Sequence, residues 1–132
     1  MSQNVEVAKR VLDAMNRRDL DAYDELAAPD FEWFPAMPGT VEGGSYRGRE
    51  GVETYLADYD KVWETFVVVP EEYRDLGDRV VILGRLQARG RGSGVQVNSA
   101  AGLVFQLQGG KISRVRGYLD HDEALRAAGL SE

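Results

Sequence analysis

VETYLADYDKVWETF, residues 52–66, has the clearest helical pattern in the chain. Its apolar and aromatic residues recur three or four positions apart, so they fall on one face of a helix, while Glu53, Asp58 and Lys61 fall on the other. We therefore expect a helix with an aromatic face that covers another layer. That face consists of Val52, Tyr55, Leu56, Tyr59, Trp63 and Phe66.

After Phe66 the pattern changes from helix to strand. Turn signals at 75–78, 90–94 and 108–110 separate four runs with strand character. Short connections of this kind join antiparallel neighbours. Glycines inside three of the runs predict bulges or bends, and hence a strongly curled sheet whose concave side needs a cover. The runs lie near 65–74, 79–90, 95–107 and 111–120, and the glycines are Gly84, Gly102 and Gly117.

Shorter elements flank this core on both sides. Before it, apolar spacing predicts a helix over about 3–17, and Asp19 is placed to cap a second short helix that Pro29 ends. At the other end, Asp120 with Glu123 has capping-box spacing for a tail helix at about 122–128. A short strand at 31–34 and a Pro- and Gly-rich loop at 35–48 complete the chain. The sequence therefore predicts one α+β domain, residues 1–132, with N-terminal helices over a cone-like curved antiparallel sheet that encloses a pocket.

Composition narrows the class of protein. The chain has 132 residues, 43% of them hydrophobic, which is enough to bury the core of a single domain. Sixteen basic against 22 acidic residues give a net charge of −6, which argues against nucleic-acid and anionic-membrane partners. There is no cysteine, so disulfides and thiolate chemistry are not expected. We find no signal-peptide core and no apolar run long enough to span a membrane, and we expect a cytoplasmic protein.

The element order resembles that of the nuclear transport factor 2-like superfamily, and the closest resemblance is to its SnoaL-like branch, named after a polyketide cyclase. Four segments carry this resemblance across most of the chain. They are NRRDLD (16–21), APDFEW (28–33), YRGREGV (46–52) and GKI to YLD (110–120). The resemblance implies a cone-shaped pocket between helices and sheet, and commonly a homodimer across the outer sheet face. It does not choose a reaction, because this fold carries isomerases, cyclases, hydrolases and non-catalytic binders.

Two chemistries of the superfamily do not match residue by residue. The ketosteroid isomerase roles of oxyanion tyrosine, general base and second oxyanion donor fall on Val11, Phe34 and near Gly102. The limonene epoxide hydrolase Arg and its two Asp fall on Arg85, Gln87 and Gly117, so only Arg85 is in place. We expect neither mechanism, although a one-residue slip in register would reverse the facing of a strand.

SnoaL-type chemistry leaves one candidate acid or base. That chemistry uses one acidic or histidine group near the end of the sheet, and His121 is the only histidine in the chain. His121 shares strand parity with Gly117, whose position is expected to face the pocket. The alternative is that His121 begins the tail helix at the surface, with Asp120 as its N-cap.

Ligand-binding candidates combine aromatic walls with a few polar groups. Arg85 could hold an anion or oxygen, and Asn98 lies mid-strand, where it faces either the pocket or solvent. The aromatic residues could equally form an ordinary core. The aromatic set is Trp33, Tyr46, Tyr55, Tyr59 and Trp63.

Three carboxylates are further candidates for a general base. Glu32, Glu42 and Asp58 would suit that role if buried beside the aromatic set, although each alone is typical of a surface acid. Residues 120–122 contain Asp, His and Asp, but three adjacent residues rarely surround one ion, so we expect no metal site and no cofactor.

Two functions of different class follow, and a third stays open. The first is a cofactor-independent enzyme, of cyclase, isomerase or lyase type, that acts by acid–base catalysis on a hydrophobic oxygenated substrate. The second is a non-catalytic protein that binds a small hydrophobic molecule in the same pocket. A buried ionisable group in the pocket would favour the enzyme, whereas Tyr and Arg groups alone would favour the binder. A dimerisation module with a filled cavity is the third.

Overall fold

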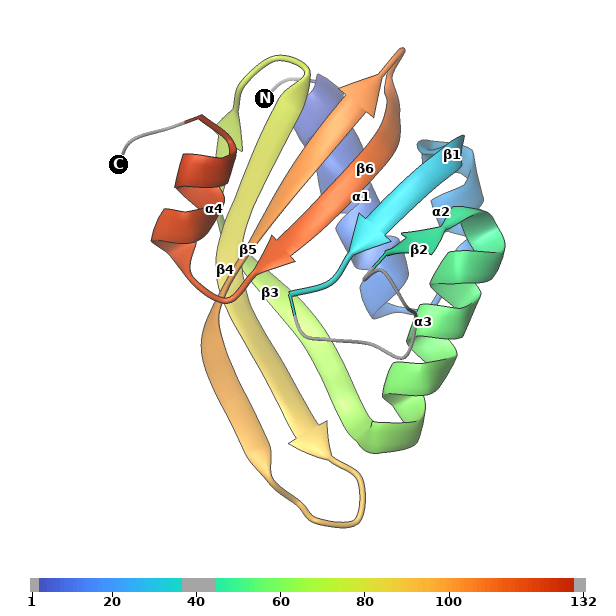
Figure 1. The fold of residues 1–132 in the computed structure, drawn as a ribbon, viewed down its shortest axis with the longest axis vertical. Helices are drawn as coiled ribbons and strands as arrows, with labels where there is room; N and C mark the ends of the chain where they lie inside the picture. The colour runs from blue at the N-terminus through green and yellow to red at the C-terminus, as the bar shows by residue number, and fades with distance from the viewer. Residues whose placement is uncertain (1–2, 37–44, 130–132) are drawn as a thin grey trace.

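The structure, a computed structural model, describes residues 3–36 and 45–129 and has the α+β architecture expected from the sequence (Figure 1). The four predicted strand runs are present as the last four strands, in chain order, of one sheet. The elements in chain order are α1 (Gln3–Asn16), α2 (Leu20–Leu26), β1 (Ala27–Phe34), β2 (Tyr46–Arg47), α3 (Gly48–Val62), β3 (Trp63–Asp75), β4 (Arg79–Gly90), β5 (Gln96–Gln108), β6 (Lys111–Tyr118) and α4 (His121–Ala127).

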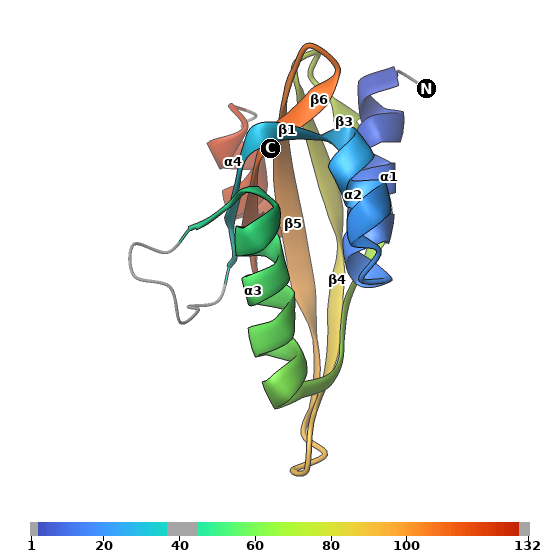
Figure 2. The ribbon, with the colours of Figure 1, turned by 90° about the vertical axis from the view of Figure 1, so that its right-hand side faces the viewer.

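The six strands form one curved, unclosed sheet in the order β2-β1-β6-β5-β4-β3. All neighbours are antiparallel except β1 and β6, which run parallel. Helices α1 and α2 lie on the inner face of the sheet, and α4 lies on the opposite, outer face (Figure 2). Helix α3 contacts β1 and β2 at one end of the strand order and β3 at the other, so it bridges the opening of the curl.

Alternation along the strands divides the apolar residues between two cores. Val80 and Ile82 face the inner core with the helices, whereas Val81 and Leu83 face outward and contact Leu125 of α4. The predicted bends have two different explanations. Gly84 lies beside a register shift in the β3–β4 pairing, as expected for a bulge. Gly102 instead makes room for α4, because a Cβ there would lie 2.5 Å from the Cβ of Ala124.

The ends of the short helices follow the predicted capping. The Asp19 carboxylate accepts a hydrogen bond from the backbone N–H of Ala22 at 3.1 Å. The Asp120 carboxylate accepts from the backbone N–H groups of Asp122 and Glu123, at 2.7 and 3.2 Å. In the described part of the chain, no helix is both long enough and apolar enough to cross a bilayer.

The central helix is shorter than the sequence pattern predicts. Helix α3 ends at Val62, and Trp63 has the extended φ and ψ of −113° and 130°. Trp63 and Phe66 therefore belong to β3 and not to the helix. The helical spacing continued across the boundary by coincidence, while the β-branched residues 67–69 favour a strand from this point onward.

Two smaller predictions near the N-terminal half also need correction. Helix α2 ends at Leu26, before Pro29, and β1 begins at Ala27, earlier than the predicted strand. Pro29 is tolerated inside β1 because the β1–β6 register shifts between Ala27 and Glu32. The segment predicted to be a loop also contributes the two-residue strand β2, which pairs with β1.

Candidate functional site

The predicted aromatic set forms one continuous row between α3 and the sheet. The ring centroids of Trp33 and Tyr55 are 5.3 Å apart, those of Tyr55 and Tyr59 are 4.4 Å apart, and those of Tyr59 and Phe66 are 4.9 Å apart. Trp63 extends the row beyond Phe66, and Tyr46 contacts Tyr55 within it. The aromatic residues of β1, α3 and β3 are therefore brought together even though they are remote in sequence.

Two adjacent hollows lie against this row, and together they are called the aromatic hollow here. Each measures about 40 Å³, which is small beside the roughly 300–1,000 Å³ of pockets for drug-sized ligands. The aromatic side chains therefore fill most of the space, and a ring-sized ligand needs some of them to rotate. The lining residues that both hollows share are Trp33, Tyr55, Tyr59, Phe66, Val68 and Leu103.

The polar groups in this lining are few. Among the described residues that line the hollow there is no Asp, Glu or His, and Arg18 is the one charged side chain. Burial raises the pKa of Tyr59 to about 12 and raises the pKa of Tyr55 further, so both phenols are neutral hydrogen-bonding groups at neutral pH. The lining can donate hydrogen bonds to a ligand, but the described part of it offers no carboxylate or imidazole base.

The indole N–H of Trp33 is the most unusual of these polar groups. Trp33 is 6% exposed, and within the described residues its Nε1 has no hydrogen-bond partner. The Tyr55 hydroxyl is close enough for this N–H to stabilise its phenolate, but not in hydrogen-bonding geometry. A buried donor without an acceptor is destabilising, and such donors are rare in folded proteins. The hydroxyls of Tyr23 and Tyr46 share this property but do not line the hollow.

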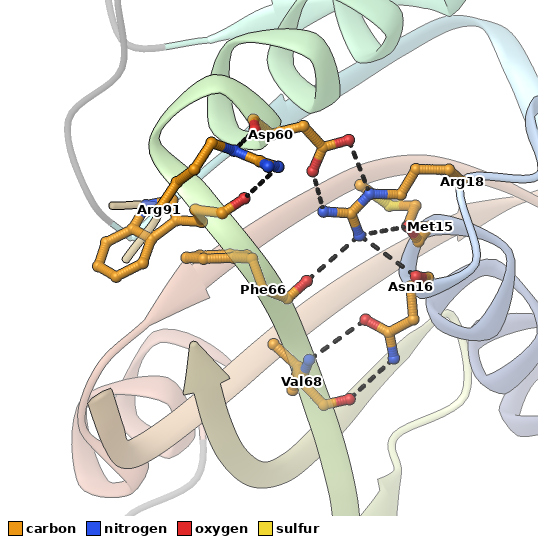
Figure 3. A network of polar contacts seen from close by, with 8 residues as sticks. Met15, Asn16, Arg18, Asp60, Phe66, Val68 and Arg91 are labelled. Atoms are coloured by element: carbon orange, nitrogen blue, oxygen red, sulfur yellow. Dashed lines mark hydrogen bonds and ion pairs between the residues drawn. The ribbon is translucent and has the colours of Figure 1, made fainter. Parts of the chain in front are cut away.

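The turn between α1 and α2 forms one end of the hollow, against edge strand β3 (Figure 3). The Asn16 side chain exchanges two hydrogen bonds with the backbone of Val68, donating to its oxygen at 2.9 Å and accepting from its nitrogen at 3.2 Å. Arg18 donates to the Phe66 oxygen at 3.2 Å and pairs with Asp60 of α3. Two side chains thus satisfy edge groups of β3 and also line the hollow.

Arg85 and Asn98 lie away from the hollow. Arg85 Nε donates to Asn98 Oδ1 at 2.7 Å, and Asn98 is exposed while Arg85 is half-buried. Their neighbours Leu86 and Ala101 line the hollow, so alternation places Arg85 and Asn98 on the outer sheet face. Their predicted contact with a ligand stays a prediction that the lining does not support.

His121 also lies outside the lining. It is the first residue of α4, and its Nε2 is 2.9 Å from the backbone oxygen of Gly84. Because a carbonyl oxygen only accepts, Nε2 must carry the hydrogen of this bond. The ring is half-buried against the β4 backbone, so the position matches the alternative in which His121 begins the tail helix. No observation tests His121 as a catalytic group.

Of the three candidate carboxylates, Glu32 and Asp58 do not line the hollow. Glu32 faces outward between the buried residues Phe31 and Trp33, and it pairs with Arg47 at 3.1 Å and Arg114 at 3.3 Å. Asp58 pairs with Lys61 at 3.9 Å on the outer side of α3. Glu42 lies outside the described residues. Across residues 3–36 and 45–129, no three His, Cys, Asp or Glu side chains are grouped so as to hold a metal ion.

The positions matched to other enzymes of the superfamily are scattered. Val11 is fully buried in α1, and Gly117 lines the hollow. Phe34 faces outward, where the Arg116 guanidinium lies 4.4 Å from its ring centroid. The neighbouring residue of β1, Trp33, faces inward, and neither residue is a carboxylate.

Among the lining residues, sequence reasoning did not single out Phe66, Asn16 and Arg18 as ligand contacts. Phe66 was predicted to belong to the aromatic face of the helix, but it was not predicted to contact a ligand. Asn16 ends α1 and Arg18 lies in the turn that follows, and nothing in their local pattern shows that they reach strand β3, 48–52 positions away.

The sequence matches the model of the SnoaL-like domain over residues 8–115, most of the chain. The chain belongs to the SnoaL-like family. No curated protein matches this SnoaL-like protein. Its fold is similar to that of TerC, with 23% identity over 98% of each chain and a TM-score of 0.78. An NTF2-like protein of unknown function from Burkholderia pseudomallei K96243 has 23% identity over 96% of this chain and 97% of its own, with a TM-score of 0.78.

A third similar structure is a putative SnoaL-like polyketide cyclase from Jannaschia sp. CCS1. It has 24% identity over 98% of this chain and 90% of its own, with a TM-score of 0.75. At these identities the similarity shows the shared fold, while the match of the SnoaL-like domain over residues 8–115 confirms the family resemblance found in the sequence motifs.

Proposed function

We propose that this SnoaL-like protein binds a small, hydrophobic, cyclic molecule with an oxygen acceptor in the aromatic hollow. The observation that carries this proposal is the buried Trp33 indole N–H, which lines the hollow without a partner among the described residues. A ligand carbonyl oxygen placed there removes the cost of the unsatisfied donor. The surrounding rings supply the apolar contact that such a molecule needs.

Structural neighbours support a ligand site in this fold. TerC was co-crystallised with polyporic acid, and a protein with a ketosteroid isomerase-like fold from Catenulispora acidiphila DSM 44928 is in complex with trimethylamine. Polyporic acid and trimethylamine are ligands of those two proteins and not of this chain. For this chain, the absence of Asp, Glu and His from the described lining favours binding over acid–base catalysis.

The test compares 1-indanone with indane, which has the same bicyclic skeleton without the ketone oxygen. We expect 1-indanone to move the Trp33 indole N–H resonance downfield in a ¹H–¹⁵N spectrum and indane to leave it largely in place. Trp63 is the internal control, because its ring contacts Phe66 but does not line the hollow. Trp33→Phe assigns the resonance, and it should reduce the preference for the ketone about fivefold to tenfold. A Trp33 resonance that does not respond to millimolar 1-indanone contradicts the proposal.

The second candidate is the cofactor-independent enzyme implied by the family resemblance. The similar structure described as a putative SnoaL-like polyketide cyclase supports it. Donation from Trp33 and Tyr55 to a ketone oxygen would favour the enolate, as an oxyanion hole does. We test it by ¹H NMR in D₂O: an enzyme of this kind accelerates exchange of the protons next to the 1-indanone carbonyl, whereas a pure binder leaves the background rate unchanged.

The homodimer implied by the resemblance stays a proposal as well. Size-exclusion chromatography with light scattering tests it directly, because the monomer mass is 14.6 kDa. A mass near the monomer value at micromolar concentration would rule out a stable dimer.

A further inference from the structure

Arg18 occupies a backbone position where arginine is uncommon. Helix α1 ends with bonds from Arg18 N to Met15 O at 3.2 Å and from Asp19 N to Ala14 O at 2.8 Å, the pattern of a Schellman motif. Arg18 has a φ of 59°, and glycine or asparagine is usual at this left-handed position. Within the described residues, Arg18 is the only non-glycine residue with positive φ. A disfavoured backbone at a cavity wall points to a function for the side chain.

The guanidinium of Arg18 joins three elements at the end of the aromatic hollow (Figure 3). Its Nη2 and Nε donate to the two carboxylate oxygens of Asp60 at 2.6 and 3.3 Å. Its Nη1 lies 3.2 Å from the backbone oxygens of Met15, Asn16 and Phe66. The carbonyl contacts fix the plane of the guanidinium, while the Asp60 side chain is 44% exposed and can move into water.

Arg18 separates the aromatic hollow from an outer groove. It lines both, as do Asn16 and Phe66, and the groove of about 370 Å³ also contains Asp60 and Arg91. The Arg91 side chain donates to the backbone oxygens of Asp60 and Trp63, which holds the far side of the groove in place. The Arg18 side chain is 27% exposed, so its charge is accessible from both sides.

The charge of Arg18 also acts inside the hollow. It lowers the pKa of Tyr55, against the larger effect of burial, which raises it. The guanidinium is therefore close enough to stabilise negative charge at the Tyr55 end of the hollow.

We infer that Arg18 selects ligands that combine an apolar ring body with one anionic oxygen group, a carboxylate or an enolate. The ring body lies in the aromatic hollow, and the anionic group replaces Asp60 on the Arg18 guanidinium at its mouth. The exchange is favourable because Asp60 gains solvation at the surface, while the ligand anion forms charge-assisted hydrogen bonds in a partly dehydrated site. This inference rests on the proposed function and adds the ligand's charge to it.

The test uses 1-indanecarboxylate and 1-indanecarboxamide, which have the same ring body and differ in charge. Dissociation constants come from NMR titration at low salt. We expect the carboxylate to bind the wild-type protein about tenfold more tightly than the amide. Arg18→Asn should remove this preference, and asparagine tolerates the left-handed backbone, so the turn is retained. Arg18→Lys keeps the charge without the planar fork and should give an intermediate preference.

Asp60→Asn should change the preference for the carboxylate ligand in the opposite direction. It removes the competing carboxylate and keeps the shape, so carboxylate affinity should rise about threefold to tenfold while amide affinity stays the same. A purely structural Arg18–Asp60 pair predicts instead that both ligands lose affinity together. A thermal melt of each variant shows whether it is folded. If Arg18→Asn does not fold, Asp60→Asn and Arg18→Lys still test whether Arg18 selects the anion.

The outcomes separate this inference from the proposed function. Equal affinity for carboxylate and amide, with 1-indanone still shifting the Trp33 resonance, overturns the role of Arg18 and leaves the binding function in place. If none of the three ligands binds, the proposed function fails and the inference fails with it. Carboxylate preference that disappears in Arg18→Asn and grows in Asp60→Asn establishes Arg18 as the anion-selecting residue.

Discussion

The inner and outer faces of the sheet are built from alternate residues of the same strands, yet the aromatic hollow lies on only one of them. The outer face meets a single short helix, and small residues such as Gly102 and Ala124 allow close contact there. The inner face meets three helices and the large rings of Trp33, Tyr55 and Phe66, which come from different elements. The hollow is therefore found where rings held by separate elements meet, whereas small residues let α4 lie close against the outer face.

The largest expected effect compares the same substitution on both faces. Leu83 and Leu103 are 4% and 5% exposed, but Leu83 packs under α4 and Leu103 lines the hollow. Leu83→Ala should reduce the free energy of unfolding by about 3–4 kcal/mol and Leu103→Ala by about 2–3 kcal/mol, because Leu103 loses fewer contacts. Urea unfolding measures both. An equal or greater loss for Leu103→Ala would show that the hollow is filled.

A smaller effect concerns pH and the inner face. The pKa of Tyr59 is raised to about 12 from an ordinary value near 10, so the folded state favours the neutral phenol. The neutral Tyr59 phenol contributes fully to the free energy of unfolding below pH 10. This contribution, on the order of 1–3 kcal/mol, is lost as the pH rises toward 12. Denaturant unfolding at pH 9, 10 and 11 checks this. In Tyr59→Phe the slope should be shallower, and an unchanged slope would mean that other groups cause the loss.

Local patterns predicted most of the fold. The last four strands, the two capped short helices and the order of elements follow from turn residues, periodicity and capping positions, which act over a few residues. Trp63 shows the limit of that approach, because helical spacing continued past Val62 while the backbone became extended. At Trp63 the periodicity favoured a helix and the β-propensity of the following residues favoured a strand. The pairing of β3 with β4 fixes the strand.

The candidate site was predicted less well, because it depends on which face a residue occupies. The aromatic set was correctly grouped, since large apolar side chains must be buried somewhere together. Arg85 and Asn98 were ligand candidates whose facing the sequence left open; the structure turns both outward, and a one-residue change of register would reverse this. Arg18 had no local signal, because its contacts with Asp60 and Phe66 span more than 40 positions.

The smallest expected effect compares the caps of α2 and α4, one short helix on each face. Asp120 accepts two backbone hydrogen bonds and Asp19 accepts one, so Asp120→Ala should cost about 1 kcal/mol and Asp19→Ala somewhat less. Asparagine at either position keeps the acceptor and should restore most of the loss. Urea midpoints measure these differences. If Asp120→Ala leaves the midpoint unchanged, α4 is held by its apolar packing on the outer face, including the close approach of Ala124 to Gly102, and not by the cap.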